Sequence, residues 1–307
     1  MTLGSLLARA ALRRPDAGAV VDGRRRLTYA ELDARAAGTA AGFARLGLVR
    51  GDRALLALRN RLEHVVAYWA LQKLGAVAVP VNFRLAGNEL RYVLEDSGAR
   101  LALFEASTAG AVLEASRGGK ARLVFVGDTA SAATHGAVAV FDDLLDQEGS
   151  VVPGSPPVEG DPSLILYTSG TTGRPKGVPR THKNHYAGAM AHVIQCGYTW
   201  GERTLGVMPL YHTMGIHALT SMAAINGCFV CQPDWSSAGA LELIARERLT
   251  ALYLIPTLFW ELTHAPELAR TDVSSVRKLA YAGAPMLAPL TEACARTFRP
   301  DVFVNHY

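Results

Sequence analysis

The sequence predicts an α/β fold in which helices cover both faces of mostly parallel β-sheets. In its first half, short apolar segments alternate with segments of helical periodicity, as in folds built of layered strands and helices. The expected strands are apolar throughout rather than at alternate positions, as in parallel sheets buried on both faces. Hydrophobic residues make up 50% of the 307 residues and charged residues 19%, a composition that supplies a large core.

The expected elements follow in a regular order. An amphipathic helix ends near Arg14, and a second helix begins at Thr28, which forms a capping box with Glu31, and stops at Gly47. Further helices are expected at 61–74, 88–96, 181–190, 241–248 and 258–263. Strands are expected at 53–58, 76–81, 100–104, 123–126, 164–166, 205–208, 251–257, 279–285 and 301–307.

Charge and hydropathy exclude several classes of protein. The net charge is only +4, and the single run of three basic residues, 24–26, precedes an expected helix, so we interpret it as a solvated turn. The N-terminus lacks the basic and apolar regions of a signal peptide, and the apolar stretch 65–81 is interrupted by polar residues and too short to cross a bilayer. We therefore expect a cytoplasmic protein without a nucleic-acid partner or a membrane span.

The cysteines do not predict a metal or redox site. Cys228 and Cys231 form a lone CxxC within an apolar segment, without the second pair that a zinc site of this type needs. Both are expected to be buried cysteines of a strand. No metal ligand is predicted in the sequence.

The stretch 167–178, YTSGTTGRPKGV, carries the strongest functional signal. It follows the apolar segment 164–166 and is rich in small residues, whose backbone N–H groups can approach a ligand closely. Its hydroxyls and its lysine are donors that suit phosphate oxygens: Thr168, Ser169, Thr171, Thr172 and Lys176. The helix expected at 181–190 could direct the positive end of its dipole toward the same phosphates.

This stretch has two other possible interpretations, a P-loop and a flexible linker. A P-loop needs Gly-Lys-Ser/Thr at its end, whereas here Pro175 precedes Lys176 and Gly177 follows it. A flexible Ser/Thr/Gly linker would fit the composition. The buried strand before it and the ordered Arg-Pro-Lys-Gly after it favour a phosphate-binding loop.

The string YTSGTTGRPKG resembles the signature of the adenylate-forming enzymes, which include acyl- and aryl-CoA ligases, nonribosomal peptide adenylation domains and luciferases. The segments LTYAELDARA, LGAVAVPVNFRL and MPLYHTMG extend the resemblance across nearly all of the chain. It implies the stacked, mostly parallel sheets of that family's large N-terminal domain, and ATP, Mg²⁺ and coenzyme A as cofactors. It also implies that Thr168 and Lys176 are catalytic, and that the phosphates are bound by Thr168, Ser169, Gly170, Thr171, Thr172, Gly173 and Lys176.

The segment MPLYHTMG at 208–215 carries a second functional signal, centred on His212. A lone histidine after a strand is more often structural than catalytic. The resemblance, closest to the aryl-CoA ligase branch, implies instead that His212 lies at the mouth of an acyl pocket, with Thr213 and Met214 beside it, and orders the substrate carboxylate. Amino-acid-activating relatives carry an aspartate here, and its absence disfavours an α-amino acid.

Two strand ends complete the expected site. By resemblance, Gly283, Ala284 and Pro285 contact adenine, although a plain strand-to-helix turn would explain them as well. Asn305 and Tyr307 would flank the adenine. The acyl pocket would include Tyr253, Ala282 and His306, with core packing an equal explanation for Tyr253.

The resemblance also implies a domain plan. We expect residues 1–160 to form a first, scaffolding α/β subdomain and residues 161–307 a second that carries the site, joined by the Pro- and Gly-rich stretch 149–162. In the family, the strand at 301–307 continues into a Tyr-Gly-x-Thr-Glu motif, of which only Tyr307 is present. We therefore expect an incomplete chain that does not sustain turnover alone.

The predicted activity is ATP-dependent activation of a carboxylic acid to an acyl-adenylate, followed by transfer to coenzyme A. An aromatic or cyclic acid is favoured, while medium-chain fatty acids remain open. An adenylating enzyme that loads a carrier protein, a luciferase-like oxidase and a non-catalytic nucleotide-binding remnant are the alternatives. A homodimer is one assembly that the sequence leaves open.

Overall fold

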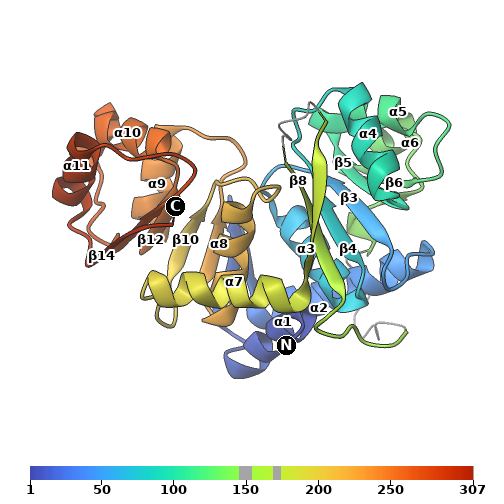
Figure 1. The fold of residues 1–307 in the computed structure, drawn as a ribbon, viewed down its shortest axis with the longest axis horizontal. Helices are drawn as coiled ribbons and strands as arrows, with labels where there is room; N and C mark the ends of the chain where they lie inside the picture. Colours follow the sequence, from blue (N-terminus) through green and yellow to red (C-terminus); the bar gives the residue numbers. More distant parts are fainter. Residues whose placement is uncertain (145–153, 169–173, 307) are drawn as a thin grey trace.

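The computed structural model describes residues 1–144, 154–168 and 174–306. Within these residues the chain forms two seven-stranded sheets that lie side by side (Figure 1). Each sheet is parallel except for one antiparallel pair at an edge, β8–β9 in one sheet and β1–β2 in the other. This confirms the predicted α/β fold of mostly parallel sheets flanked by helices.

The first sheet has the strand order β7-β6-β5-β3-β4-β8-β9. Its strands, in chain order, are β3 (Arg53–Ala57), β4 (Val77–Pro80), β5 (Leu101–Glu105), β6 (Arg122–Val126), β7 (Ala139–Val140), β8 (Pro162–Thr168) and β9 (Lys176–Thr181). The second sheet has the order β14-β13-β12-β10-β11-β1-β2. Its strands are β1 (Gly18–Asp22), β2 (Arg25–Thr28), β10 (Arg203–Gly206), β11 (Cys228–Cys231), β12 (Ala251–Leu254), β13 (Lys278–Tyr281) and β14 (Val302–Asn305).

Helices cover the sheets on both faces (Figure 1). They are α1 (Leu3–Arg13), α2 (Tyr29–Arg45), α3 (Leu62–Leu74), α4 (Gly87–Ser97), α5 (Ala109–Ser116), α6 (Thr129–Thr134), α7 (His182–Gln195), α8 (Thr213–Ala224), α9 (Ser237–Glu247), α10 (Pro256–His264) and α11 (Ala288–Phe298). Short 3-10 turns lie at Ala106–Thr108, Asp142–Leu144 and Pro266–Arg270.

The strands are apolar throughout because both faces of each are buried. On β3, Leu56 packs into the core shared with α1, α2 and α3, while the neighbouring Leu55 packs into a second core beneath α4 and α5. Successive side chains of a strand point to opposite faces, so this strand needs a hydrophobic residue at every position. The same core that holds Leu56 continues to the second sheet and joins the two.

Local sequence signals predicted several elements correctly. Thr28 caps α2, and its capping box with Glu31 is formed in both directions. Cys228 and Cys231 are buried on β11, as predicted for strand cysteines.

Among the described residues, no helix is both long enough and apolar enough to cross a membrane.

The basic run 24–26 is a solvated turn only at Arg24, which is exposed in the turn between β1 and β2, and the interpretation is wrong for the other two arginines. Arg25 and Arg26 lie on β2, the second strand of a hairpin that the sequence did not reveal. Arg26 binds Glu247 of α9 through two hydrogen bonds of 2.7 Å, and Arg25 pairs with Glu63 at the start of α3. Two of the three arginines therefore fix the edge of the second sheet to its neighbours.

The sheets do not divide the chain at residue 160, where a boundary between subdomains was expected. The hairpin β1–β2 joins the second sheet, where Val20 lies opposite Phe229 of β11. Conversely, β8 and β9 complete the first sheet, although they follow residue 160. Each sheet is therefore built from both parts of the chain.

Candidate active site

The predicted phosphate loop connects two antiparallel strands. Thr168 ends β8, Lys176 begins β9, and the two residues are direct partners across the ladder. Both are exposed, so the hydroxyl and the ammonium group stand at the loop end of the hairpin. The remaining predicted phosphate ligands lie outside the described residues: Ser169, Gly170, Thr171, Thr172 and Gly173.

The flanks of the loop are fixed against α4. The hydroxyl of Tyr167 donates a hydrogen bond of 2.6 Å to Asp96, and that of Tyr92 donates one of 3.0 Å to the carbonyl of Pro175. A Cβ atom at Gly177 would lie 3.0 Å from side-chain atoms of both Ile165 and Tyr167, so a larger residue there would displace these two side chains. The positions of Thr168 and Lys176 are thus set by a rigid base.

The expected role of the helix after β9 is wrong. Its N-terminal cap, Thr181, lies opposite Pro162, at the start of β8, whereas the loop follows the end of β8. Helix α7 therefore begins at the far end of the hairpin (Figure 1). Since dipole effects fall off within about one helical turn, α7 does not direct its N-terminus at the phosphates.

His212 and Thr168 lie on one cavity. Its volume is about 480 Å³, and besides these two its lining includes Asn82, Glu89 and Tyr211. His212 is exposed directly before α8, and its ring packs against that of Tyr211. Partial burial of the imidazole lowers the pKa of His212. The structure thus brings two of the predicted catalytic residues together.

Asn60 positions the segment that leads to His212. Its amide nitrogen donates to the carbonyls of Gly206 and Met208 at 2.9 and 2.8 Å, and its carbonyl accepts from the backbone N–H of Leu210 at 3.1 Å. The side chain is buried, so all three bonds are made away from water. The first half of the chain was expected to be scaffold. Through Asn60 it holds the MPLYHTMG segment at 208–215 in place.

Close packing also fixes the start of α8. A Cβ atom at Gly215 would lie 2.3 Å from the carbonyl oxygens of both Met208 and Pro209, so no other residue fits. Thr213 and Met214, predicted beside the acyl pocket, form the first turn of this helix, with Met214 buried. The MPLYHTMG motif is thus a tight strand-to-helix connection.

The predicted adenine turn and the end of β14 are neighbours. Gly283 follows β13 with φ of +87°, a conformation that glycine adopts without strain. Tyr281 of β13 lies opposite Asn305 of β14, and the N–H of His306 donates to the carbonyl of Tyr281 at 2.9 Å. Gly283, Pro285 and Asn305 are exposed at this sheet edge, which leaves them accessible to a flat ring, whereas Tyr307 lies outside the described residues.

The predicted acyl-pocket residues belong to a cluster of rings. Tyr253 is buried at β12, and its ring centroid lies 5.2 Å from that of His306 and 4.5 Å from that of His192 on α7. His185 and His217 extend the cluster, with centroids 6.4 Å apart. Ala282 is buried at the end of β13.

Sequence reasoning missed three of these histidines, although α7 carries a signal for them. His185, His192 and Cys196 recur at the helical spacing of one face, with Gly188 between them. A Cβ atom at Gly188 would lie 2.7 Å from Nε2 of His217, so this glycine admits the imidazole of α8. The face is polar where a helix packed on a sheet is normally apolar.

The imidazoles of the cluster are neutral at pH 7. Burial lowers the pKa of His192 to about 3 and that of His217 to about 4, with smaller contributions from neighbouring histidines and, for His217, from the charge of Arg180. It also lowers the pKa of His185 and of His306. Neutral rings can both donate and accept hydrogen bonds, which suits an uncharged part of a substrate.

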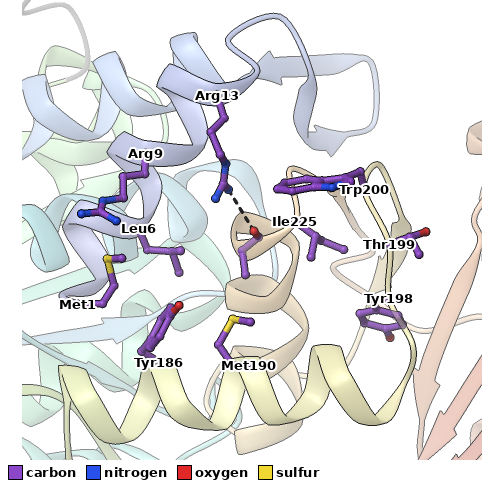
Figure 2. Close-up of a pocket in the computed structure, with 11 residues that line it drawn as sticks. Met1, Leu6, Arg9, Arg13, Tyr186, Met190, Tyr198, Thr199, Trp200 and Ile225 are labelled. Atoms are coloured by element: carbon purple, nitrogen blue, oxygen red, sulfur yellow. Dashed lines mark hydrogen bonds between the residues drawn. The ribbon is translucent and has the colours of Figure 1, made fainter.

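A second cavity, of about 520 Å³, lies between helices α1 and α7 (Figure 2). Arg13 points into it, but its guanidinium already donates to the carbonyl of Ala224 at 3.1 Å and to Asn226, and it stacks on Trp200. None of the predicted site residues lines this cavity. We therefore place the candidate active site at the loop, His212 and the ring cluster.

Comparison with known proteins decides the family. A family model described as AMP-binding enzyme matches residues 7–307. The chain belongs to this family. It is 32% identical to a long-chain-fatty-acid–CoA ligase of Mycobacterium tuberculosis, over 85% of the chain and 50% of that protein. It is 33% identical to a 2-succinylbenzoate–CoA ligase of Bacillus licheniformis, over 94% of the chain and 56% of that protein.

Solved structures of the family agree with the fold. The inhibitor-bound N-terminal domain of FACL13 from Mycobacterium tuberculosis superimposes with a TM-score of 0.87 at 27% identity, covering 100% of this chain and 75% of that one. The anthranilate–CoA ligase AuaEII superimposes with a TM-score of 0.91 over 98% of this chain and 59% of that one, and at 24% identity it supports the fold alone. The chain spans about half the length of the curated relatives it matches.

Proposed function

We propose that the protein carrying this chain activates a carboxylic acid with ATP to an acyl-adenylate, releases pyrophosphate, and transfers the acyl group to coenzyme A. The observation that carries the proposal is the pairing of Thr168 and Lys176 at the loop end of one hairpin, with His212 on the same cavity as Thr168. A phosphate site and a carboxylate site must lie close together for this reaction.

The chemistry needs no nucleophile from the protein. A carboxylate oxygen attacks the α-phosphorus of ATP, the bond to the β-phosphate oxygen breaks, and pyrophosphate leaves with the electron pair. Lys176 and the hydroxyl of Thr168 would bind the leaving phosphates and offset their developing charge, while His212 orders the carboxylate. Mg²⁺ would neutralise phosphate charge in this step, and we assign it no ligand among the described residues.

We infer an aromatic or cyclic acid as the substrate. The rings of Tyr253, His192 and His306 lie together with centroids 4.5–5.2 Å apart, and flat rings of this kind suit the ring of a substrate. Relatives named for aromatic acids support this choice, including a feruloyl-CoA synthase from Amycolatopsis and a 4-chlorobenzoate–CoA ligase from Arthrobacter, both more than 30% identical. No acidic residue follows His212 to pair with a substrate ammonium group, which disfavours α-amino acids.

The protein is also proposed to be cytoplasmic. All four cysteines, each within the described residues, are buried and unpaired. Free thiols suit a reducing compartment, where ATP and coenzyme A are also available.

Product analysis of the full-length protein tests the proposal. The protein is incubated with ATP, Mg²⁺ and coenzyme A together with substituted benzoates, cinnamates, cyclic acids or linear fatty acids, and products are identified by mass spectrometry. We expect an acyl-CoA from an aromatic or cyclic acid. A product from linear acids alone would contradict the substrate class, and an adenylate that never passes to coenzyme A would point to a carrier protein as the acceptor.

A further inference from the structure

Three side chains with metal-binding atoms converge beside the candidate acyl pocket. His192 and Cys196 lie one turn apart on α7, and His306 follows β14, 110 residues further along the chain. The Cys196 sulfur lies 3.2 Å from Nε2 of His306 and 3.7 Å from Nδ1 of His192. In the part of the chain that the structure describes, this is the one group of three His, Cys, Asp or Glu residues whose donor atoms could share a metal ion.

Two of the three distances between the donor atoms match tetrahedral zinc. The three atoms lie within 4.8 Å of one another, so the two imidazole nitrogens would have to approach to roughly 3.4 Å around one ion. Zinc binds cysteine sulfur at about 2.3 Å and histidine nitrogen at about 2.0–2.1 Å, which places the sulfur and the nitrogen about 3.6 Å apart around one ion. The observed sulfur–nitrogen distances of 3.2 and 3.7 Å lie close to this value. One thiol and two imidazoles also suit zinc rather than magnesium or calcium, which take oxygen ligands.

Ring packing alone does not explain the arrangement. It accounts for the contact of His192 with Tyr253, whose centroids lie 4.5 Å apart. It does not account for the thiol, whose sulfur lies 3.7 and 3.9 Å from the two ring nitrogens of His192 and within hydrogen-bond distance of Nε2 of His306. His192 and Cys196 are 2% and 1% exposed, so both donors are held in place by their surroundings.

Zinc binding has a defined proton balance. The Cys196 thiol would release its proton to solvent as its sulfur binds the ion, and each imidazole would bind the ion through one ring nitrogen.

We propose that His192, Cys196 and His306 bind one Zn²⁺ ion. Three protein ligands leave a fourth position of the tetrahedron, which water or a donor atom of the substrate takes. His306 is only half-buried, so the ion would be reached from its side of the cluster. The contact with substrate rests on the proposed function, whereas the binding of zinc does not.

Metal titration of the purified full-length protein tests the proposal without any substrate. After removal of metal with a chelator, the protein is titrated with Zn²⁺ and dialysed, and zinc is counted by mass spectrometry. In parallel it is titrated with Co²⁺, which reports a thiolate ligand by a near-ultraviolet charge-transfer band and tetrahedral geometry by visible bands. We expect one ion per chain and both sets of bands.

Variants assign the ligands. Cys196→Ser and His306→Ala should each lower the zinc affinity by about 100-fold or more, and Cys196→Ser should abolish the charge-transfer band. Cys294→Ser is the matched control, because this thiol is equally buried but lies on α11, outside the cluster. Circular dichroism checks that each variant is folded, and the cobalt spectrum of the unmodified protein tests the proposal even if a variant is not.

Two outcomes would overturn the site. One is less than 0.1 zinc ion per chain, on the order of contamination, in the unmodified protein. The other is a charge-transfer band that survives in Cys196→Ser. Zinc binding without any acid activation would leave the metal site intact and contradict the proposed function instead, so the two failures are distinguishable.

Discussion

The guanidinium of Arg180 donates a hydrogen bond of 2.9 Å to the hydroxyl of Thr213. Arg180 lies on β9, the strand that begins with Lys176, and Thr213 is the first residue of α8, directly after His212. This bond therefore connects the hairpin that carries the phosphate loop with the segment that carries the proposed carboxylate ligand. In the proposed function, we expect this bond to set the position of the phosphate site relative to the carboxylate site.

Thr213→Val removes this bond while keeping the shape of the side chain. A hydrogen bond to a charged group contributes roughly 1.5–3 kcal/mol, so we expect kcat/KM for the acid to fall about tenfold or more in steady-state adenylation. Thr263→Val is the control, because that hydroxyl bonds only to the carbonyls of its own helix and to the adjacent His264. Equal activity of the two variants would show that the Arg180 bond does not position the site.

Asn60→Asp tests whether Asn60 positions the MPLYHTMG segment at 208–215. The substitution replaces two N–H donors by a carboxylate that faces the carbonyls of Gly206 and Met208, so we expect a loss of roughly 2–4 kcal/mol in the free energy of unfolding and weaker adenylation. Asn88→Asp, exposed in the first turn of α4, should leave both unchanged or slightly improved. Denaturant unfolding and pyrophosphate exchange measure the two effects, and a stable Asn60→Asp variant would contradict the assignment.

Two glycine substitutions should act in opposite directions. Gly215→Ala places a Cβ atom against two carbonyl oxygens at the start of α8 and should destabilise the protein by roughly 1–3 kcal/mol or prevent folding. Gly110→Ala, in α5, meets no atom within 4 Å and should stabilise it by roughly 0.5–1 kcal/mol through helix propensity. Thermal unfolding of both variants gives the sign. A neutral Gly215→Ala would mean that α8 starts differently.

Glu247→Gln should reduce stability in a pH-dependent manner. Hydrogen bonds from Arg26 lower the pKa of the Glu247 carboxyl from 4.5 to about 2, helped by Arg246 and Arg203. Because the pKa is lower in the folded state, the carboxylate stabilises the protein above pH 4.5 and loses this contribution as the pH falls toward 2. We expect the variant to lose roughly 1–3 kcal/mol at pH 7, and the difference from the unmodified protein to narrow below pH 4.5.

The control for this pair is Glu242→Gln on the same helix. Glu242 is 67% exposed and pairs only with Arg246 one turn away, so its removal should cost less than about 0.5 kcal/mol at any pH. Urea unfolding between pH 7 and pH 3.5 measures both variants. A constant difference for Glu247→Gln across this range would contradict the linkage.

The sequence predicted features whose cause is local. The capping box of Thr28 and Glu31 needs only a few consecutive residues, and the burial of Cys228 and Cys231 follows from the apolar segment around them. The strand before the predicted phosphate loop was found in the same way, because residues 164–166 are a short apolar run, whereas β9 after the loop was not predicted.

Features that depend on distant residues were missed. Asn60 bonds a segment about 150 residues away, and nothing near Asn60 in the sequence indicates that segment. The hairpin β1–β2 is stable because β11 pairs with it and because Glu247 neutralises Arg26. Cys196 meets His306 only because the C-terminal end of α7 lies beside β14, which the spacing of the two residues does not reveal.

Carboxylate-dependent ATP–pyrophosphate exchange tests the central claim most directly. The full-length protein is compared with Lys176→Ala and with Lys183→Ala, an exposed lysine at the opposite end of the hairpin. We predict exchange with an aromatic or cyclic acid, a loss of about tenfold or more in Lys176→Ala, and no change in Lys183→Ala. Exchange that is unaffected by Lys176→Ala, or ATP binding without exchange for any acid, would contradict the account.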